Sequence, residues 1–155
     1  MKITIRPYSP DDLIHIVTLF RNTIHAVNSK DYTPEQLNAW APQNIDAERW
    51  GARLLEHYTV VAECDTVICG FGDLHENGYL DHLFTHKDYQ GMGVATKIVN
   101  AIETQAKITG VAKIVVHASV TAKSFFLQKD YSVVNPQEVH YNGGVFTNYV
   151  MQKNL

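Results

Sequence analysis

Apolar and polar residues alternate at the start of the chain and then change to a helical period. Residues 2–7 alternate, which is typical of a strand with one buried face. The Ser-Pro-Asp-Asp run at 9–12 combines an N-cap residue, a proline at the first helical position and an acid at the third. Apolar residues at helical spacing then predict a long helix that ends near Val27. They are Leu13, Ile16, Val17, Phe20, Ile24 and Val27.

Two shorter helices are expected before the middle of the chain. A Thr-Pro-Glu run at 33–35 caps a helix that continues through Trp40. This helix ends before Pro42, because a proline disfavours helical geometry in the preceding residue. Asp46 caps the next helix, which contains Leu54. The first third of the chain is therefore predicted to be one strand followed by helices.

The middle of the chain is rich in residues that favour strands. Runs at 58–63, 67–74 and 79–85 are separated by short turns. One turn holds Asn77-Gly78, the dipeptide that favours a tight hairpin. Three successive strands with short connections predict an antiparallel meander.

The last third alternates helices with strands. An amphipathic pattern from Val94 to about Ile108, closed by Gly110 at a C-cap position, predicts a helix. The remaining segments are a buried strand at 113–118, a helix at 121–129, and strands at 131–134 and 145–151. No repeat, linker or boundary interrupts the order. The sequence predicts one α/β (α+β) domain over 1–155, with a mixed, mostly antiparallel sheet of six to seven strands flanked by about four helices.

Charge and composition narrow the possible functions. The net charge of -3 gives no basic field of the kind that nucleic-acid binding needs. The uncharged runs are shorter than the roughly 18 apolar residues of a membrane span, and the first residues lack the layout of a signal peptide. Cys64 and Cys69 lack the paired spacing of a zinc site and indicate buried thiols. We expect a cytoplasmic protein with no metal and with neither nucleic acid nor a membrane as its partner.

A glycine loop lies between the strand ending at Thr85 and the helix starting at Val94. The first amides of a helix lack internal partners and carry partial positive charge, so glycines there let a phosphate approach the backbone. The same glycines, Gly91 and Gly93, would also permit a simple tight turn. The spacing is that of neither an NTPase P-loop nor a dinucleotide-binding strand–loop–helix unit.

Two motifs together resemble those of the GCN5-related N-acetyltransferase superfamily. Gln90-x-x-Gly93-x-Ala95 matches the family's Gln/Arg-x-x-Gly-x-Gly/Ala loop. Residues 83–89 are similar to its lead-in strand and turn, with Lys87 in place of the usual proline. Residues 119–131 are similar to its second motif, although Ser119 and Asp130 stand where asparagine and glycine are common. The element order agrees along nearly the whole chain.

The resemblance implies an acyl-CoA N-acyltransferase fold and acetyl-CoA as the acyl donor. The loop amides would hold the pyrophosphate, and the pantetheine arm would lie along a splayed strand beside the main-chain groups of Leu83 and Thr85. The cofactor-binding residues that it implies are Leu83, Phe84, Thr85, Gln90, Gly91, Met92, Gly93, Val94, Ala95, Thr96, Ser119, Ala122, Phe125 and Phe126. The implied reaction is direct transfer of an acetyl group to an amine of a small molecule or a protein.

Catalytic candidates come from the strand at 79–85 and from tyrosines elsewhere. In the family, base or water-ordering residues occupy positions matching Tyr79 and Asp81, so Asp81 is the first candidate for general base or for binding the charged amine. Strand alternation would send His82 to the opposite face, away from Asp81. Asp81 could equally be a solvated or salt-bridged strand residue.

Phe126 stands where many family members have the tyrosine that protonates the thiolate. Either the thiolate leaves unprotonated, or Tyr131, Tyr141 or Tyr79 serves as the donor. Phe126 also leaves a second hypothesis, a catalytically silent CoA-binding sensor or interaction module.

The acceptor pocket is expected from the helices that follow the first strand. Its candidate residues are His25, Asn28, Tyr32 and Trp40, a set that would suit a cationic, partly apolar amine. The same segment could instead form a packed lid. The sequence leaves open the identity of the acceptor, N- against O-transfer, and a homodimer.

Overall fold

The structure, a computed structural model, describes residues 2–155 and has one seven-stranded sheet. The strands are β1 (Ile3–Pro7), β2 (Tyr58–Cys64), β3 (Val67–Leu74), β4 (Tyr79–Thr85), β5 (Lys113–Ser119), β6 (Ser132–Tyr141) and β7 (Gly144–Asn154). Their order across the sheet is β1-β2-β3-β4-β5-β7-β6. Every pair is antiparallel except β4 with β5. This confirms the predicted mixed, mostly antiparallel sheet.

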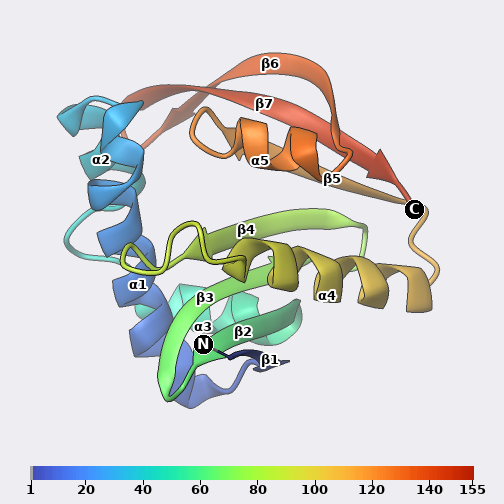
Figure 1. The fold of residues 1–155 in the computed structure, drawn as a ribbon. Coiled ribbons are helices and arrows are strands. Elements are labelled where there is room, and N and C mark those ends of the chain that lie inside the picture. The colour runs from blue at the N-terminus through green and yellow to red at the C-terminus, as the bar shows by residue number, and fades with distance from the viewer. Residues whose placement is uncertain (1) are drawn as a thin grey trace.

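Five α-helices lie along this sheet (Figure 1). They are α1 (Leu13–Ala26), α2 (Pro34–Trp40), α3 (Ala47–Glu56), α4 (Val94–Ile108) and α5 (Lys123–Gln128). Two 3-10 turns, at Pro10–Asp12 and Asn28–Lys30, flank α1. Thr33 accepts from the amide of Gln36, which confirms the predicted cap of α2. Between residues 2 and 155, no helix combines the length with the apolarity that crossing a membrane requires.

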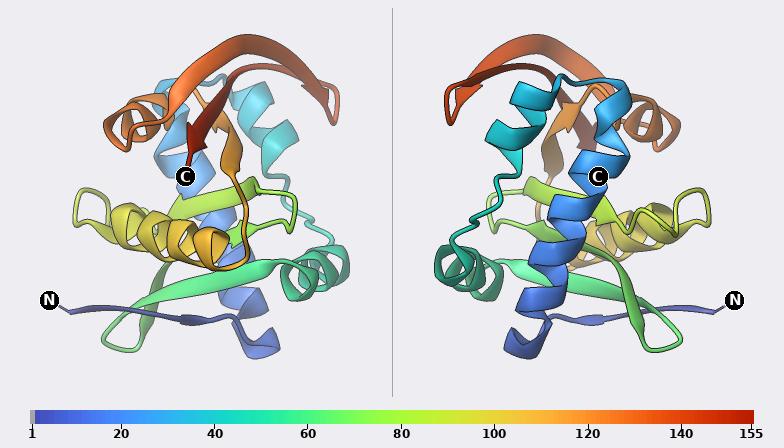
Figure 2. Two further views of the ribbon diagram at one scale, coloured as in Figure 1. Left: turned by 90° about the vertical axis from the view of Figure 1, so that its right-hand side faces the viewer. Right: turned by 90° about the vertical axis from the view of Figure 1, so that its left-hand side faces the viewer.

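The two faces of the sheet carry separate cores. Figure 2 shows α4 and α3 on opposite sides of the strands. On one face, Ile98 and Ile102 of α4 pack with Leu80 and Ile114 of the sheet. On the other, apolar side chains of α1, α2 and α3 pack against the opposite side of β2 and β3. The last two strands form a long hairpin that arches over α5 (Figures 1 and 2).

Two glycines in β3 bring α4 against the backbone of the sheet. A Cβ at Gly70 would lie 2.6 Å from Val94 Cγ1 and 3.0 Å from the carbonyl oxygen of Phe84. A Cβ at Gly72 would lie 2.8 Å from Ile98 Cγ2. These contacts are closer than packed carbon atoms tolerate, so α4 takes its position because both residues lack a side chain.

We expect Gly70→Ala to lower the free energy of unfolding by about 1–3 kcal/mol, because the added methyl group overpacks the contact with α4. Equilibrium denaturation in urea measures the change. Gly51→Ala is the matched control, since only the flexible end of Leu13 lies near that position of α3. Equal stability of the two variants would contradict the close packing of α4 on β3.

Strand β4 contains a bulge at Asp81. Asp73 of β3 pairs with His82, whereas the next residue, Leu74, pairs with Leu80, so Asp81 has no partner across the ladder. A bulge inserts one residue and reverses the alternation beyond it. Leu80 and Leu83 therefore face α4, while His82 and Phe84 face α1 and α3.

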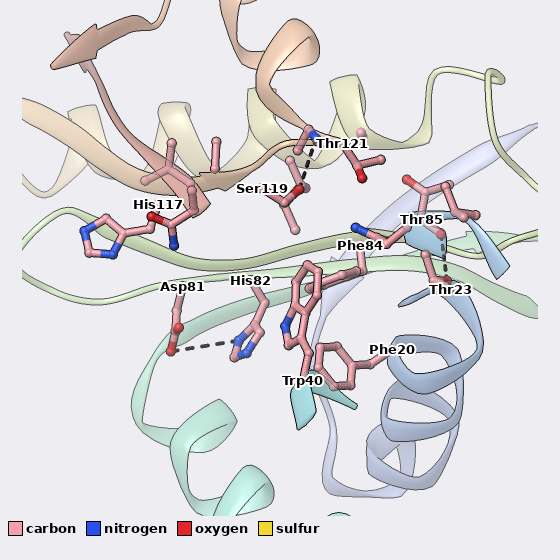
Figure 3. Close-up of a pocket in the computed structure, with 18 of the residues that line it drawn as sticks. Phe20, Thr23, Trp40, Asp81, His82, Phe84, Thr85, His117, Ser119 and Thr121 are labelled. Atoms are coloured by element: carbon pink, nitrogen blue, oxygen red, sulfur yellow. Dashed lines mark hydrogen bonds and ion pairs between the residues drawn. The ribbon is translucent and has the colours of Figure 1, made fainter. Parts of the chain in front are cut away.

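This bulge corrects the prediction that His82 points away from Asp81. His82 Nδ1 lies 3.9 Å from Asp81 Oδ2, and both side chains line the same cavity (Figure 3). Regular alternation placed them on opposite faces because it assumes an uninterrupted strand.

Candidate active site

A cavity of about 910 Å³ opens where β4 and β5 separate. These two strands pair only at Tyr79 with Val115 and at Leu80 with Val116. Beyond Leu80 they diverge, so the side of β4 that faces β5 has no neighbouring strand there. Figure 3 shows Asp81, His82 and Phe84 of β4 on one side of the gap and His117 and Ser119 of β5 on the other.

The diverging part of β4 offers main-chain groups to a ligand. The carbonyls of His82 and Phe84 lie against Gly72 and Gly70 of β3, so the groups of Leu83 and Thr85 point the other way. The Thr85 carbonyl already accepts from Thr23 Oγ1 at 3.0 Å and from Gln90 Nε2 at 2.8 Å. That carbonyl is therefore occupied, and Leu83 is the better partner for an extended ligand.

The glycine loop presents a run of unpartnered amides. Gly91 and Gly93 have φ values of 72° and 85°, in the left-handed region that favours glycine. Within residues 2–155, the amides of residues 90 to 96 donate no hydrogen bond. The first amide of α4 that does so is that of Lys97, which donates to the carbonyl of Gly93. Nothing lies within 4 Å of a Cβ built at either glycine. The loop is open, polar and at the positive end of a helix, as an anion site requires.

Most of the implied cofactor residues line the cavity. The lining set includes Leu83, Phe84, Thr85, Gln90, Gly91, Gly93, Val94, Ala95, Thr96, Ser119, Ala122, Phe125 and Phe126. Met92 is the exception, because its half-exposed side chain is not part of the lining. The Ser119 hydroxyl accepts from the amide of Ala122 at 3.0 Å and so stabilises the turn that leads into α5.

The acceptor candidates separate into two groups. Asn28, Tyr32 and Trp40 line the cavity. His25 does not line it. Its Nε2 forms a hydrogen bond with the carbonyl of Ala41 at 2.8 Å, which links α1 to the end of α2. The Tyr32 hydroxyl accepts from the amide of Val120 at 2.9 Å and so links the segment after α1 to the residue that follows β5.

The catalytic candidates also differ in whether they line the cavity. Tyr79 and Asp81 line the cavity, and burial raises the pKa of Tyr79 to about 12. Tyr131 lies outside the cavity, in the core beneath α4, where its hydroxyl donates to Glu103 Oε2 at 2.9 Å. Its position therefore argues against the role of thiolate donor that the sequence suggested, whereas Tyr79 and Tyr141 remain at the cavity.

A charged cluster that the sequence did not predict lies beside the cavity. The Asp73 carboxylate is fully buried, with Oδ1 2.8 Å from His82 Nδ1 and Oδ2 2.8 Å from His57 Nδ1. Arg53 of α3 reaches Asp81 at 3.6 Å. Burial opposes the charge on Asp73, but the two histidines lower its pKa to about 2. Their pKa values are raised by the same carboxylate, against the opposing effect of burial.

His57, Asp73 and Asp81 bring potential metal ligand atoms within 4.8 Å of one another. The 2.8 Å separation of His57 and Asp73 is that of a hydrogen bond, and no metal is assigned to this cluster.

The acceptor end of the cavity has an aromatic wall, and the sequence predicted only some of its residues. Phe20, Trp50 and Phe146 line it together with Trp40 and Phe84.

The Asn148 side-chain oxygen is buried, and among the described residues it has no hydrogen-bond donor. Asn148 of β7 pairs with Ser119 of β5 and lines the cavity, so this oxygen is a ready acceptor for a ligand N–H.

Comparison with known proteins identifies the family. Residues 28–153 match the family model described as an acetyltransferase (GNAT) domain. The chain is 33% identical over 151 residues to the uncharacterized N-acetyltransferase YafP of Escherichia coli (strain K12), covering 97% of this chain and 95% of that protein. The chain therefore belongs to the GNAT N-acetyltransferases.

Solved structures have the same fold. A crystal structure of a GCN5-related N-acetyltransferase from Rhodopseudomonas palustris is 32% identical, with a TM-score of 0.96 over 100% of this chain and 97% of that one. The PaiA N-acetyltransferase of Thermoplasma acidophilum, in complex with coenzyme A, has a TM-score of 0.79 at 17% identity, with both chains fully covered. YncA of Salmonella typhimurium, with acetyl-CoA, has a TM-score of 0.74 at 18% identity, covering 100% and 95%.

Proposed function

We propose that this protein transfers the acetyl group of acetyl-CoA directly to a primary amine with a partly apolar body. The observation that carries the proposal is the gap between β4 and β5, which ends at a loop with seven consecutive unpartnered amides, residues 90 to 96. Two structures of the same fold contain coenzyme A or acetyl-CoA. The donor would place its diphosphate on the loop and its pantetheine arm along Leu83.

The acceptor would enter from the opposite end of the cavity. Apolar and aromatic side chains there, Phe20, Trp40 and Trp50 among them, suit an apolar body. Asp81 supplies a negative charge near the point where the strands diverge, which suits a protonated amine. The amine must lose its proton before it attacks the thioester carbon, and Asp81 is a candidate either to take that proton or to hold the ammonium group.

The leaving thiolate has few proton donors near it. Phe126 is buried and has no proton to give. Tyr79 lines the cavity and keeps its proton at neutral pH, because burial raises its pKa to about 12. We assign Tyr79 as the donor if the thiolate is protonated on the enzyme.

The proposal is tested by calorimetry with acetyl-CoA, followed by thiol release with a panel of amines that contains phenethylamine, spermidine and a lysine peptide. Acetyl-CoA should bind, and at least one amine should be acetylated with release of one thiol per product. Absence of acetyl-CoA binding contradicts the proposal. Binding without acetylation of any amine would favour a silent CoA-binding module, the alternative that Phe126 suggests.

We expect Asp81→Asn to leave the Kd for acetyl-CoA within about twofold and to lower kcat/KM for the amine by about 10²-fold, the scale of a lost acid–base group. The amide keeps the shape of the side chain but loses its charge and basicity. Steady-state thiol release measures the effect. Asp65→Asn is the control, since Asp65 lies in the turn between β2 and β3 and adopts a positive φ that asparagine tolerates. Unchanged kcat/KM and an unchanged pH–rate profile in Asp81→Asn would remove this role from Asp81.

A further inference from the structure

A buried carboxylate between two histidines lies beneath the acceptor end of the cavity, and acetyl transfer as described above does not use it. Asp73 belongs to β3 and is fully buried. His82 comes from β4 and His57 from the end of α3, so three elements converge on one carboxylate. An isolated charge at such a site is strongly disfavoured, and it persists here because both of its oxygens receive hydrogen bonds.

The hydrogen bond to Asp73 determines which nitrogen of His82 carries the proton. With its pKa at about 2, the carboxylate is ionised at neutral pH and can only accept. His82 must therefore donate from Nδ1, at 2.8 Å, and the neutral ring keeps its lone pair on Nε2. Within residues 2–155, Nε2 has no hydrogen-bond partner, and it is not among the buried unpartnered atoms. Nε2 is thus an accessible base on a residue that lines the cavity.

The ring of His82 is held in place by its neighbours. Its centroid lies 4.7 Å from that of Trp50 and 6.2 Å from that of Phe20, which meets it edge-on. The residue follows the bulge at Asp81, beside the point where β4 leaves β5. A pantetheine arm that follows β4 from the glycine loop would bring its sulfur toward this point. Nε2 of His82, in a ring whose tautomer is fixed, would therefore lie close to the reacting thioester.

We propose that His82 is the general base of the transfer, with Asp73 as the residue that positions it. This inference rests on the proposed acetyl transfer. The ammonium group first gives one proton to Nε2 of His82. The neutral nitrogen then bonds to the thioester carbonyl carbon, the carbon–sulfur bond breaks with its electron pair remaining on sulfur, and the second proton that the nitrogen loses passes to the leaving thiolate. Asp73 keeps the ring in the required tautomer and stabilises the imidazolium that results.

Asp81 then takes the other role that its position allows. Its Oδ2 lies 3.9 Å from His82 Nδ1, and Arg53 lies 3.6 Å from the same carboxylate oxygen. Asp81 would hold the incoming ammonium group beside the base, and Arg53 would balance the charge when the site is empty. His57 donates to the second oxygen of Asp73 and so fixes the carboxylate that orients His82.

The charges around His82 determine how the reaction depends on pH. Asp73 of β3 and Asp81 of β4 favour the imidazolium, whereas Arg53 of α3 and burial oppose it. His57, at the end of α3, competes for the same carboxylate. The result is a pKa above the ordinary 6.5, so the basic form of His82, and with it the rate, should increase as pH rises through that value.

The test compares His82→Asn with wild type. Asparagine places its amide nitrogen near the position of Nδ1, so it can still donate to Asp73, but it has no base at the position of Nε2. We expect kcat/KM for phenethylamine to fall by at least about 10²-fold and the inflection above pH 6.5 to disappear. Calorimetry should give a Kd for acetyl-CoA within about twofold of wild type. His15→Gln, on the exposed face of α1, is the control and should match wild type in all three measurements.

Histidine nitrogen NMR on the wild-type protein gives a second readout that needs no acceptor. Above its pKa, His82 should carry its proton on Nδ1 and none on Nε2. A neutral ring protonated on Nε2, or a His82→Asn variant that retains the wild-type rate and pH profile, would overturn the assignment. Loss of activity on chelation that added Zn²⁺ restores would also overturn it, because the cluster would then bind a metal. Failure of acetyl-CoA to bind wild type would instead contradict the proposed function, while the NMR result would still decide the state of His82.

Discussion

Replacing Gly93 with valine should abolish measurable binding of acetyl-CoA, a loss of at least about 100-fold in affinity, while the protein stays folded. Gly93 has a φ of 85°, and a β-branched side chain in this left-handed region costs about 1–3 kcal/mol. The loop can relieve this strain by turning its amides away from the positions that would hold the diphosphate. The side chain would also enter the open space in front of the loop, where nothing lies within 4 Å of a Cβ.

Gly110→Val separates these effects from general strain. Gly110 lies just beyond the C-terminal end of α4, has a φ of 80° and also faces open space. Both variants should lose a similar amount of thermal stability, but only Gly93→Val should lose the heat of acetyl-CoA binding in calorimetry. If Gly93→Val bound acetyl-CoA as wild type does, the loop could not be the diphosphate site.

Replacing Asp73 with leucine should lower the free energy of unfolding by about 3–5 kcal/mol, the scale for removing one partner of a buried ion pair. The carboxylate is fully buried, and His57 and His82 both depend on it for a hydrogen bond. Leucine has a similar volume, so the loss would come from two imidazoles left without their acceptor. Denaturation in urea at pH 6 measures the change.

The matched control is Glu138→Leu, which removes an exposed carboxylate 3.1 Å from His140. Exposed pairs of this kind are screened by water and contribute little, so stability should barely change. Equal changes in the free energy of unfolding would mean that the buried cluster around Asp73 stabilises the fold no more than an exposed ion pair does.

The difference between wild type and Asp73→Leu should depend on pH in a defined window. The pKa of Asp73 is lowered from 3.8 to about 2, so its contribution is present above pH 3.8 and is lost as the pH falls toward 2. The pKa values of His57 and His82 are raised, so their contribution is complete below pH 6.5 and is lost as the pH rises through the raised values. The difference should therefore be largest between about pH 4 and pH 6.5. A difference that is constant across this range and beyond would contradict the pairing.

The elements and the glycine loop could be predicted because their signals are local. The caps before Leu13 and Pro34, the period of α4 and the two glycines before it each lie within one stretch of the chain. The implied cofactor residues between 83 and 96 follow one strand, loop and helix, and those between 119 and 126 follow a second strand and helix, so their places on the cavity wall depend on local order.

The cluster around His82 could not be predicted in the same way. Asp73 and His57 lie 9 and 25 positions from His82 along the chain and meet it only through the pairing of β2, β3 and β4. The bulge at Asp81 leaves no clear mark in the sequence, yet it decides which face His82 takes. The position of the Tyr131 hydroxyl could not be predicted for a related reason, because the motif that contains this residue does not tell which side of the sheet the hydroxyl reaches.

The most direct test is a crystal structure of the protein with coenzyme A bound. We expect the diphosphate within hydrogen-bonding distance of amides between residues 90 and 96, the pantetheine arm beside Leu83, and the sulfur next to His82. A coenzyme whose diphosphate lies away from this loop, with the gap between β4 and β5 left empty, would contradict the site.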